Sequence, residues 1–323
     1  MGTTGERVST GRRNLRRGVV AGIIVFAVLA YVAVVLLYAA GGRGSDVQNR
    51  FLGVADPEVT TITFSPMAVI GLTQRIEVDA RISPAAEFRD EDGVGITREI
   101  GFIITPVDGE QSFVVEEGSL LELTKSLTIV ASSGAIENWP LDRYTAAVGV
   151  LAYVTDENGE KQVIPTEVKW EGFLTGWDFT VAEDYDNPVG TVDTADGRGD
   201  PVPAISIQAN RSLSTIAFGV VLLGLLVVMP ALVLFVAIRA FTGRRKVEAT
   251  LTSWMGAMLF ATVPLRTFLP GSPPIGSWID YLIVLWVVVG LITGLVVYVL
   301  AWNRWGTPTP QLEDADADGG GGD

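Results

Sequence analysis

RRKVEATLTSWMGAMLFATVPLRTFLPGSPPIGSWIDYLIVLWVVVGLITGLVVYVLAWNRW occupies residues 244–305 of the chain. The stretch holds two long apolar runs, which are joined by the Pro/Gly-rich turn GSPPIG. An apolar run of about 20 residues matches the hydrocarbon core of a bilayer, which is roughly 30 Å thick. The stretch therefore predicts a transmembrane hairpin with helices at residues 247–269 and 278–302.

The composition of the chain limits its chemistry. Its 323 residues include no Cys and no His, and the formal net charge is -14. Missing thiols and imidazoles exclude Ser-His-Asp and Cys-His nucleophilic sites and zinc sites built from Cys or His. An acidic chain is also a poor partner for nucleic acid. We expect no enzyme, cofactor, metal or nucleic-acid partner, with an acid–base pair such as Asp178 and Glu183 as a remaining enzymatic hypothesis.

A further apolar run lies near the amino terminus, at residues 18–40, directly after the Arg-rich segment 1–17. An excess of Lys and Arg beside a span marks the cytoplasmic side of a membrane. The run is longer than a usual signal-peptide core, and Tyr38-Ala39-Ala40 is a poor cleavage site. We expect a retained anchor, and a cleavable signal is the alternative.

Residues 41–211 are acidic and polar and alternate like strands. In RIEVDARI, residues 75–82, every second residue is apolar, which is typical of a half-buried strand. Comparable segments are VTTITF, ITREIGFIITPV, QSFVVEE, SLTIVAS, RYTAAVGVLAYV, KQVIPTEVKW and VPAISIQA, with turn formers between them. This spacing predicts an antiparallel β-sandwich on the outer side of the membrane.

The segment EDYDNPVGTVDTADGRGDP, residues 183–201, is rich in acids, Gly and Pro. Its composition predicts a mobile surface loop. Calcium binding is the alternative, because the carboxylates could supply oxygen ligands, although their spacing fits no defined calcium loop. The carboxylates in question are Glu183, Asp184, Asp186, Asp193 and Asp196.

The remaining segments fix the expected topology. A span at residues 212–241 contains Pro230 and is followed by the basic cluster Arg244 to Lys246, which we place in the cytoplasm. The tail, residues 303–323, is acidic and predicted to be disordered. The fold class is therefore membrane α + β, with the sandwich inserted between the first helix and a three-helix transmembrane region. Both termini are expected on the cytoplasmic side of the plasma (inner) membrane.

The first helix of the hairpin carries a stripe at steps of three and four residues, which places its members on one helix face. The stripe consists of Glu248, Thr252, Met255, Leu259, Thr262, Val263 and Arg266. Charged ends, hydroxyls and an apolar middle are typical of a pore-lining face. In the alternative interpretation the two charges lie in the headgroup zones and the rest pack against neighbouring helices.

The segment WPLDRY interrupts the strand pattern at residues 139–144. One interpretation is a turn in which Trp139 packs at the end of the sandwich and Asp142 pairs with Arg143 or a backbone amide. The other is a coupling loop that faces the membrane, with Trp139, Pro140 and Asp142 as its candidate residues.

PLRTFLPGSPPIGSWIDYLIVLWVVV, residues 264–289, together with WPLDRY, resembles a bacterial membrane family known as domain-of-unknown-function family 4436. The likeness extends from the first span to the fourth. Its most specific residues include Pro264 to Arg266, Asp280 and the hairpin-turn candidates Pro270, Pro273, Pro274 and Gly276. The resemblance implies a family whose biochemical role is not established.

A more distant likeness is to the pentameric ligand-gated ion channels. It rests on Trp139-Pro140-Leu141-Asp142, on Pro230, on Lys246-Val247 and on the turn Pro273 to Gly276. This resemblance implies a homo-oligomer whose pore is lined by the striped helix. The chain departs from that pattern in its extra amino-terminal anchor and in having no span after Trp305.

These observations favour an integral membrane protein whose sandwich serves envelope sensing or interaction, with the lipid bilayer as partner and an unknown ligand. The alternative is an oligomeric, ligand-gated channel-like protein.

Overall fold

The computed structural model describes residues 58–92, 95–120, 123–156, 161–184, 190–193, 199–202 and 204–305, together with Val25, Tyr31, Val32, Val35, Leu36, Gly159 and Pro188. The predicted segment 1–17 lies outside the described residues, as do most of the predicted span 18–40 and the tail from residue 306. The chain divides into two compact units. The first runs to Val220 and includes Pro273–Ser277, and the second holds the other residues from Val221 onward.

A four-stranded sheet forms one layer of the first unit, with the strand order β5-β2-β1-β9 among the described residues. Its strands are β1 (Thr60–Ile70), β2 (Arg75–Ser83), β5 (Leu123–Val130) and β9 (Thr166–Trp170). β1 pairs with β2 and β2 with β5 in antiparallel fashion, whereas β1 and β9 run parallel. The parallel pair differs from the all-antiparallel sandwich that the sequence predicts.

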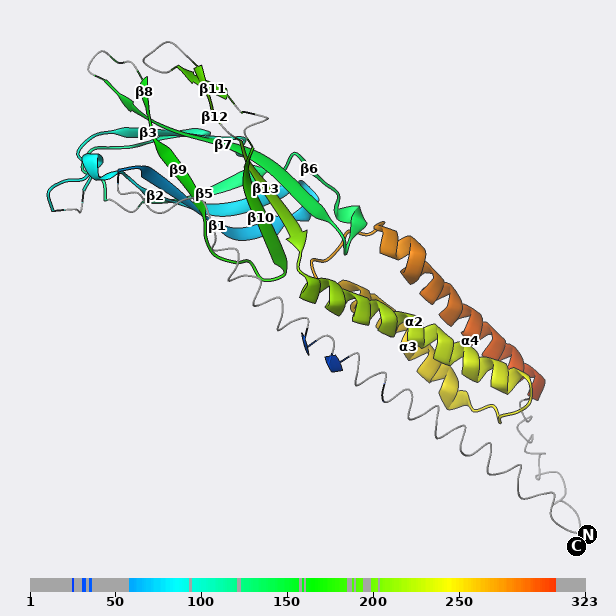
Figure 1. Cartoon of the computed structure of the whole chain (residues 1–323). Coiled ribbons are helices and arrows are strands. Elements are labelled where there is room, and N and C mark those ends of the chain that lie inside the picture. Colours follow the sequence, from blue (N-terminus) through cyan, green and yellow to red (C-terminus); the bar gives the residue numbers. More distant parts are fainter. Residues whose placement is uncertain are drawn as a thin grey trace, which may run out of the picture. The chain divides into compact units, whose positions relative to one another are not determined.

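A larger sheet forms the second layer, with the order β10-β13-β7-β3-β4 along its main path (Figure 1). Its strands are β3 (Ile100–Thr105), β4 (Ser112–Val115), β7 (Arg143–Thr155), β10 (Trp177–Asp184) and β13 (Ala204–Arg211). The short strands β6 (Ser133–Gly134) and β8 (Lys161–Ile164) also pair with β7. The connections include the short helices η1 (Gly71–Thr73), η2 (Ala86–Phe88) and η3 (Ile136–Asn138).

The core lies between these two sheets. In β2 the predicted alternation is confirmed, because Ile76, Val78, Ala80 and Ile82 are all buried. From the other sheet, residues such as Phe102 and Ile207 complete the same core. The antiparallel sheets and their common core therefore support a β-sandwich, as the period-two pattern predicts.

Three segments differ from their predicted form. Residues 177–184 form strand β10, although the sequence pattern predicts no strand there and assigns Glu183 and Asp184 to the loop 183–201. The segment KQVIPTEVKW is divided at Pro165, because proline has no N–H for a sheet ladder, and it forms β8 in one sheet and β9 in the other. The predicted loop 183–201 contains a two-stranded ribbon, β11 (Gly190–Asp193) and β12 (Gly199–Val202), and thus is not irregular throughout. The acidic composition of this segment did not indicate the pairing of β11 with β12, because such pairing depends on a partner strand.

The second unit is helical. Its helices are α2 (Leu213–Phe241), whose first turns belong to the first unit, α3 (Ala249–Thr267), the π-helical turn η4 (Asp280–Val284) and α4 (Leu285–Trp305). Among the described residues, α2 and the continuous helix Asp280–Trp305 are long and apolar enough to cross a membrane. α3 contains several Thr and Ser residues and does not reach that level of apolarity, so a spanning helix at 247–269 stays a prediction.

Close contacts hold the helices of the second unit together. Gly290 and Gly294 of α4 face α2, and a Cβ atom at Gly294 would lie 2.6 Å from Cγ1 of Val233. Small residues at this i, i+4 spacing let helix backbones approach closely. The phenol of Tyr298 donates to the carbonyl of Glu248 and accepts from its N–H, at 2.8 and 3.0 Å. α4 therefore holds both its helical neighbour and the loop that leads into α3.

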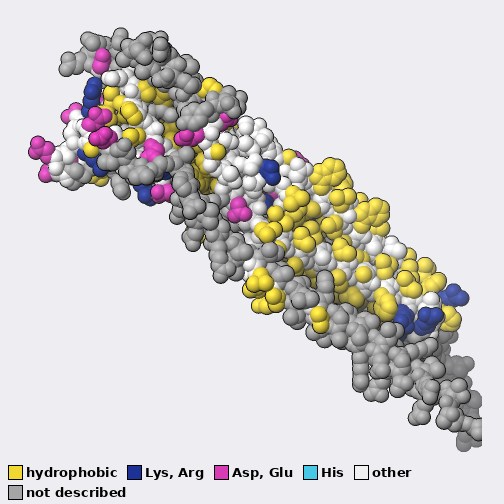
Figure 2. All heavy atoms as spheres, in the orientation of Figure 1, with side chains coloured by type: hydrophobic (Ala, Val, Ile, Leu, Met, Phe, Trp, Pro, Cys, Tyr) yellow, Lys and Arg dark blue, Asp and Glu magenta, His cyan; other side chains and the backbone are white. Residues whose placement is uncertain are grey.

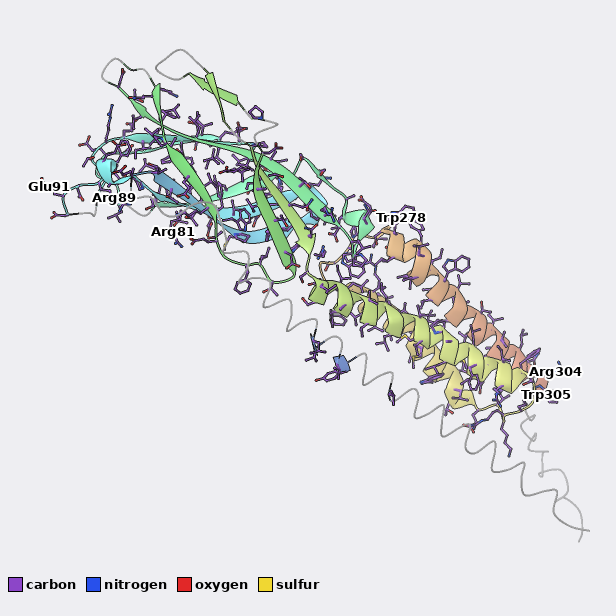
Figure 3. The ribbon with its side chains drawn as sticks, viewed as in Figure 1. Arg81, Arg89, Glu91, Trp278, Arg304 and Trp305 are labelled. Carbon is purple, nitrogen blue, oxygen red and sulfur yellow. The ribbon has the colours of Figure 1, made fainter. Side chains whose placement is uncertain are left out.

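The surface of the helical unit is mostly apolar on the visible face, and Lys and Arg side chains gather at one end (Figure 2). Trp278 lies just before the continuous helix Asp280–Trp305, and Arg304 and Trp305 lie at the other end of that helix (Figure 3). Both tryptophans are more than half exposed. Aromatic residues at both ends of an apolar helix are typical of the two membrane–water interfaces.

Candidate functional site

The candidate site lies where the sandwich continues into α2. β13 ends at Arg211, and only Ser212 separates it from the first residue of α2. The N–H of Ser212 donates to the carbonyl of Gly176 at 2.9 Å, which attaches the helix start to the loop before β10. The Ser212 hydroxyl lies 3.0 Å from Oγ1 of Thr215 and occupies the N-cap position. The helix thus begins on the sandwich without a spacer.

A buried ion pair stands at this junction. The Nε atom of Arg211 donates to Oδ1 of Asp142 at 2.9 Å, and one terminal nitrogen donates to Oδ2 at 3.0 Å. The side chains are 5% and 0% exposed, respectively. Asp142 comes from the WPLDRY loop, which follows η3 and contains a cis peptide at Trp139–Pro140. The pair therefore connects the last residue of β13 to a loop that lies 69 positions earlier in the chain.

Two aromatic rings complete the cluster. The guanidinium carbon of Arg211 lies 4.3 Å from the ring centroid of Trp177, a cation–π distance. The Tyr144 hydroxyl donates to Oδ2 of Asp142 at 3.1 Å, and its ring meets Trp177 edge-on, with centroids 5.7 Å apart. Gly71 approaches the Tyr144 hydroxyl so closely that a Cβ there would collide with it. The β1–β2 turn is thereby packed against the same cluster.

Burial raises the pKa of the Tyr144 phenol above its ordinary value, and the adjacent Asp142 carboxylate raises it further. Tyr144 is thus held as a neutral hydrogen-bond donor. Burial also raises the pKa of Asp178, which lies next to Trp177 on β10. Asp178 and Glu183 are five residues apart on one strand, on opposite faces and separated by about 16 Å, so they do not form an acid–base pair.

The WPLDRY residues lie as follows. Trp139 and Asp142 are buried, and Pro140 is partly buried. Asp142 pairs with Arg211 and not with Arg143, which is exposed. Sequence reasoning missed Arg211, although an arginine directly before an apolar span on the expected outer side departs from the usual charge bias and was an available signal.

The candidate hairpin turn is divided between the two units. Pro273, Pro274 and Gly276 belong by their contacts to the same compact unit as the sandwich, whereas Pro270 belongs to the helical unit. Ser277 is fully buried, and its hydroxyl has no hydrogen-bond partner among the described residues. Only residues 273–277 of the turn that joins α3 to α4 are therefore packed as part of the first unit.

The predicted pore-facing residues do not share one environment in the single chain. Met255 and Thr262 are buried, Thr252 and Leu259 are partly buried, and Glu248 and Val263 are exposed. Arg266 makes a bidentate ion pair with Asp280 at the start of η4, with distances of 3.1 and 2.9 Å. This pair connects the ends of α3 and α4 that flank the turn. The assignment of these residues to a pore stays a prediction.

Within the described ranges, no group of three or more Asp and Glu side chains is arranged to hold a metal ion. Asp186 and Asp196 of the acidic segment lie outside those ranges, so the calcium alternative stays open. The chemistry that the site itself supports is a fixed electrostatic connection between strand, loop and helix.

Two protein-family models match the chain, one on each side of this junction. Residues 51–198 match the family model DUF4436, a domain of unknown function. This match covers less than half of the chain, so residues 51–198 are similar to the DUF4436 family. Residues 211–305 match a second model, DUF8686, also described as a domain of unknown function. No curated protein matches the chain.

The DUF4436 match is shorter than the resemblance in the sequence suggested. It includes WPLDRY but ends at residue 198, so the motifs from Pro264 to Asp280 lie in the DUF8686 match. Asp142 lies in the DUF4436 region, and Arg211 is the first residue of the DUF8686 region. The buried ion pair therefore joins the two matched regions.

Proposed function

We propose that this protein is a non-enzymatic, multi-pass membrane protein whose extracytoplasmic sandwich senses or binds a component of the cell envelope. In this proposal the junction of Asp142 and Arg211 transmits the state of the sandwich to the helices. Its termini lie in the cytoplasm of a bacterial cell, as the basic segments predict.

The main observation in support of this proposal is the buried ion pair between Asp142 and Arg211. Burial couples the two partners of this pair tightly, because moving either one away leaves an uncompensated buried charge, whereas exposed pairs can separate at little cost. Here Arg211 lies one residue before α2, and the carbonyl of Gly176 holds the intervening Ser212. A displacement of β13 or of the WPLDRY loop must therefore change either the ion pair or the position of the first turn of α2.

The turn Pro273–Ser277 supports a second connection. It belongs to the sandwich unit, and the Arg266–Asp280 pair ties the two helices that leave it. A sandwich that rearranges on binding would therefore act on α2 through Arg211 and on α3 and α4 through this turn.

Hydrogen exchange of the full-length protein in nanodiscs tests the transmission. Asp142→Asn is expected to increase exchange several-fold in the first turns of α2 and in the turn 273–277. Asp108→Asn is the matched control, because it breaks an ion pair with Arg75 in the same sandwich whose side chains are 41% and 49% exposed. Increased exchange confined to the strands would refute the transmission.

Topology is tested with reporter fusions after residues 100 and 243, which should report opposite sides of the membrane. If both report the same side, the multi-pass arrangement fails.

The alternative is an oligomeric channel-like protein with α3 lining the pore. α3 is the more polar of the long helices, and Phe260 is 80% exposed on it in the single chain. Our leading proposal expects purified protein to be electrically silent in planar bilayers, for the wild type, Leu259→Ser and Phe260→Ser alike. Conductance that rises in Leu259→Ser but not in Phe260→Ser, the control about 100° around the helix, would favour the channel, because a polar side chain eases wetting of an apolar constriction.

A further inference from the structure

Three large apolar side chains are exposed at the end of the sandwich from which α2 departs. They are Leu72 in the β1–β2 turn, Leu141 in the WPLDRY loop and Phe173 in the β9–β10 loop, which are 66%, 73% and 66% exposed. Single exposed apolar residues are common on protein surfaces. Three at the tips of separate loops at one end of a sandwich form a surface, which we call the loop-tip surface.

Each of the three loop tips is close in sequence to a residue that makes contacts at the junction. Leu72 follows Gly71, which lies against the Tyr144 hydroxyl. Leu141 directly precedes Asp142, the partner of Arg211. Phe173 lies three residues before Gly176, whose carbonyl accepts the Ser212 N–H. All three therefore lie close to the residue from which α2 begins.

The length of α2 indicates what the loop-tip surface contacts. Its 29 residues extend for about 43 Å at a rise of about 1.5 Å per residue. A bilayer is about 40–45 Å thick with its headgroups, and its hydrocarbon core takes about 30 Å of that. A spanning α2 therefore has its first residues in a headgroup layer, and the β9–β10 loop that is bonded to Ser212 lies at the same level. The WPLDRY loop is held there through Arg211, and the β1–β2 turn through Tyr144.

We propose that Leu72, Leu141 and Phe173 contact the lipid bilayer, with their side chains in the headgroup region around the start of α2. Apolar and aromatic side chains gain by leaving water for the boundary between headgroups and acyl chains. The contact fixes the height of the sandwich over the bilayer, so the ion pair at the junction lies next to lipid. This inference rests on the membrane assignment of α2 in the proposed function.

The chain contains no cysteine, so a single introduced cysteine can be labelled selectively. Leu72→Cys, Leu141→Cys and Phe173→Cys are each labelled with an environment-sensitive fluorophore in the full-length protein. The variants are reconstituted into phosphatidylcholine vesicles that contain lipids spin-labelled near the headgroup or near the end of the acyl chain. Leu120→Cys is the matched control, since Leu120 is 69% exposed and lies between β4 and β5, at the opposite end of β2 from Leu72. Val227→Cys, near the middle of α2, reports on the membrane assignment.

The three tips are expected to be quenched by the headgroup-proximal label several-fold more strongly than Leu120, and Val227 most strongly by the deep label. Tips quenched no more than Leu120, with Val227 quenched, would overturn the lipid contact and leave the membrane assignment intact. A blue-shifted but unquenched fluorophore at the tips would also overturn it, because protein would then cover the surface. No quenching at Val227 would overturn the membrane assignment itself.

Discussion

Asp142→Asn removes the charge of the carboxylate and nearly preserves its shape. The guanidinium of Arg211 then stays buried against Trp177 without a counter-ion, because its side chain is 5% exposed. Breaking a buried pair on one side costs about 3–5 kcal/mol, since one charge is left uncompensated. For a domain of this size such a loss lowers Tm by about 6–20 °C. Thermal unfolding followed by near-UV circular dichroism of the buried tryptophans measures the shift.

Two controls separate charge from packing. The triple variant Asp142→Leu, Arg211→Met and Tyr144→Phe is expected to recover most of the lost stability, because apolar replacement of both partners of a buried pair is often neutral. Tyr144→Phe is included because the Tyr144 hydroxyl would otherwise lose its acceptor, Asp142. Asp108→Asn breaks a pair that is nearly half exposed and should cost less than about 1 kcal/mol. If Asp142→Asn costs no more than Asp108→Asn, the pair is not the structural connection described above.

Gly294→Leu should lower the free energy of unfolding of the helical unit in detergent by about 1–3 kcal/mol, because the new side chain would overlap Val233. Gly224→Leu is the control and should not lower it, because Gly224 has open space around it. Burial raises the pKa of the Tyr144 phenol in the folded state, so as pH rises the unfolded chain loses this proton at a lower pH than the folded chain does. The wild type should therefore lose stability as pH rises above about 10, the ordinary pKa of a tyrosine. Tyr144→Phe should lose less over that alkaline range, and equal losses in urea titrations would argue against the shift. Residues 58–212 expressed alone should give a circular dichroism spectrum dominated by strand, and a helical spectrum would contradict an independent sandwich.

Much of the architecture was predictable because its signals are local. Period-two alternation in RIEVDARI placed Ile76 and Val78 in the core. The apolar runs placed α2 and the continuous helix Asp280–Trp305 within three residues of their observed bounds. The candidate site was predictable only in part. WPLDRY stood out by composition, but the partner of Asp142 lies far along the chain and is brought close by β7 and β13.

Sequence by itself therefore determined most of the strand segments, though not β10, β11 and β12, and the two helices that are apolar enough for a membrane. It also determined which chemistries the missing Cys and His exclude. Tertiary structure alone decided that β9 runs parallel to β1, that the missing side chain of Gly294 leaves room for Val233, and that Arg211 pairs with Asp142. The physical reason is the range of the forces involved. Propensity and hydrophobic period act between near neighbours in sequence, whereas ion pairing and close packing depend on which distant segments the whole core brings into contact.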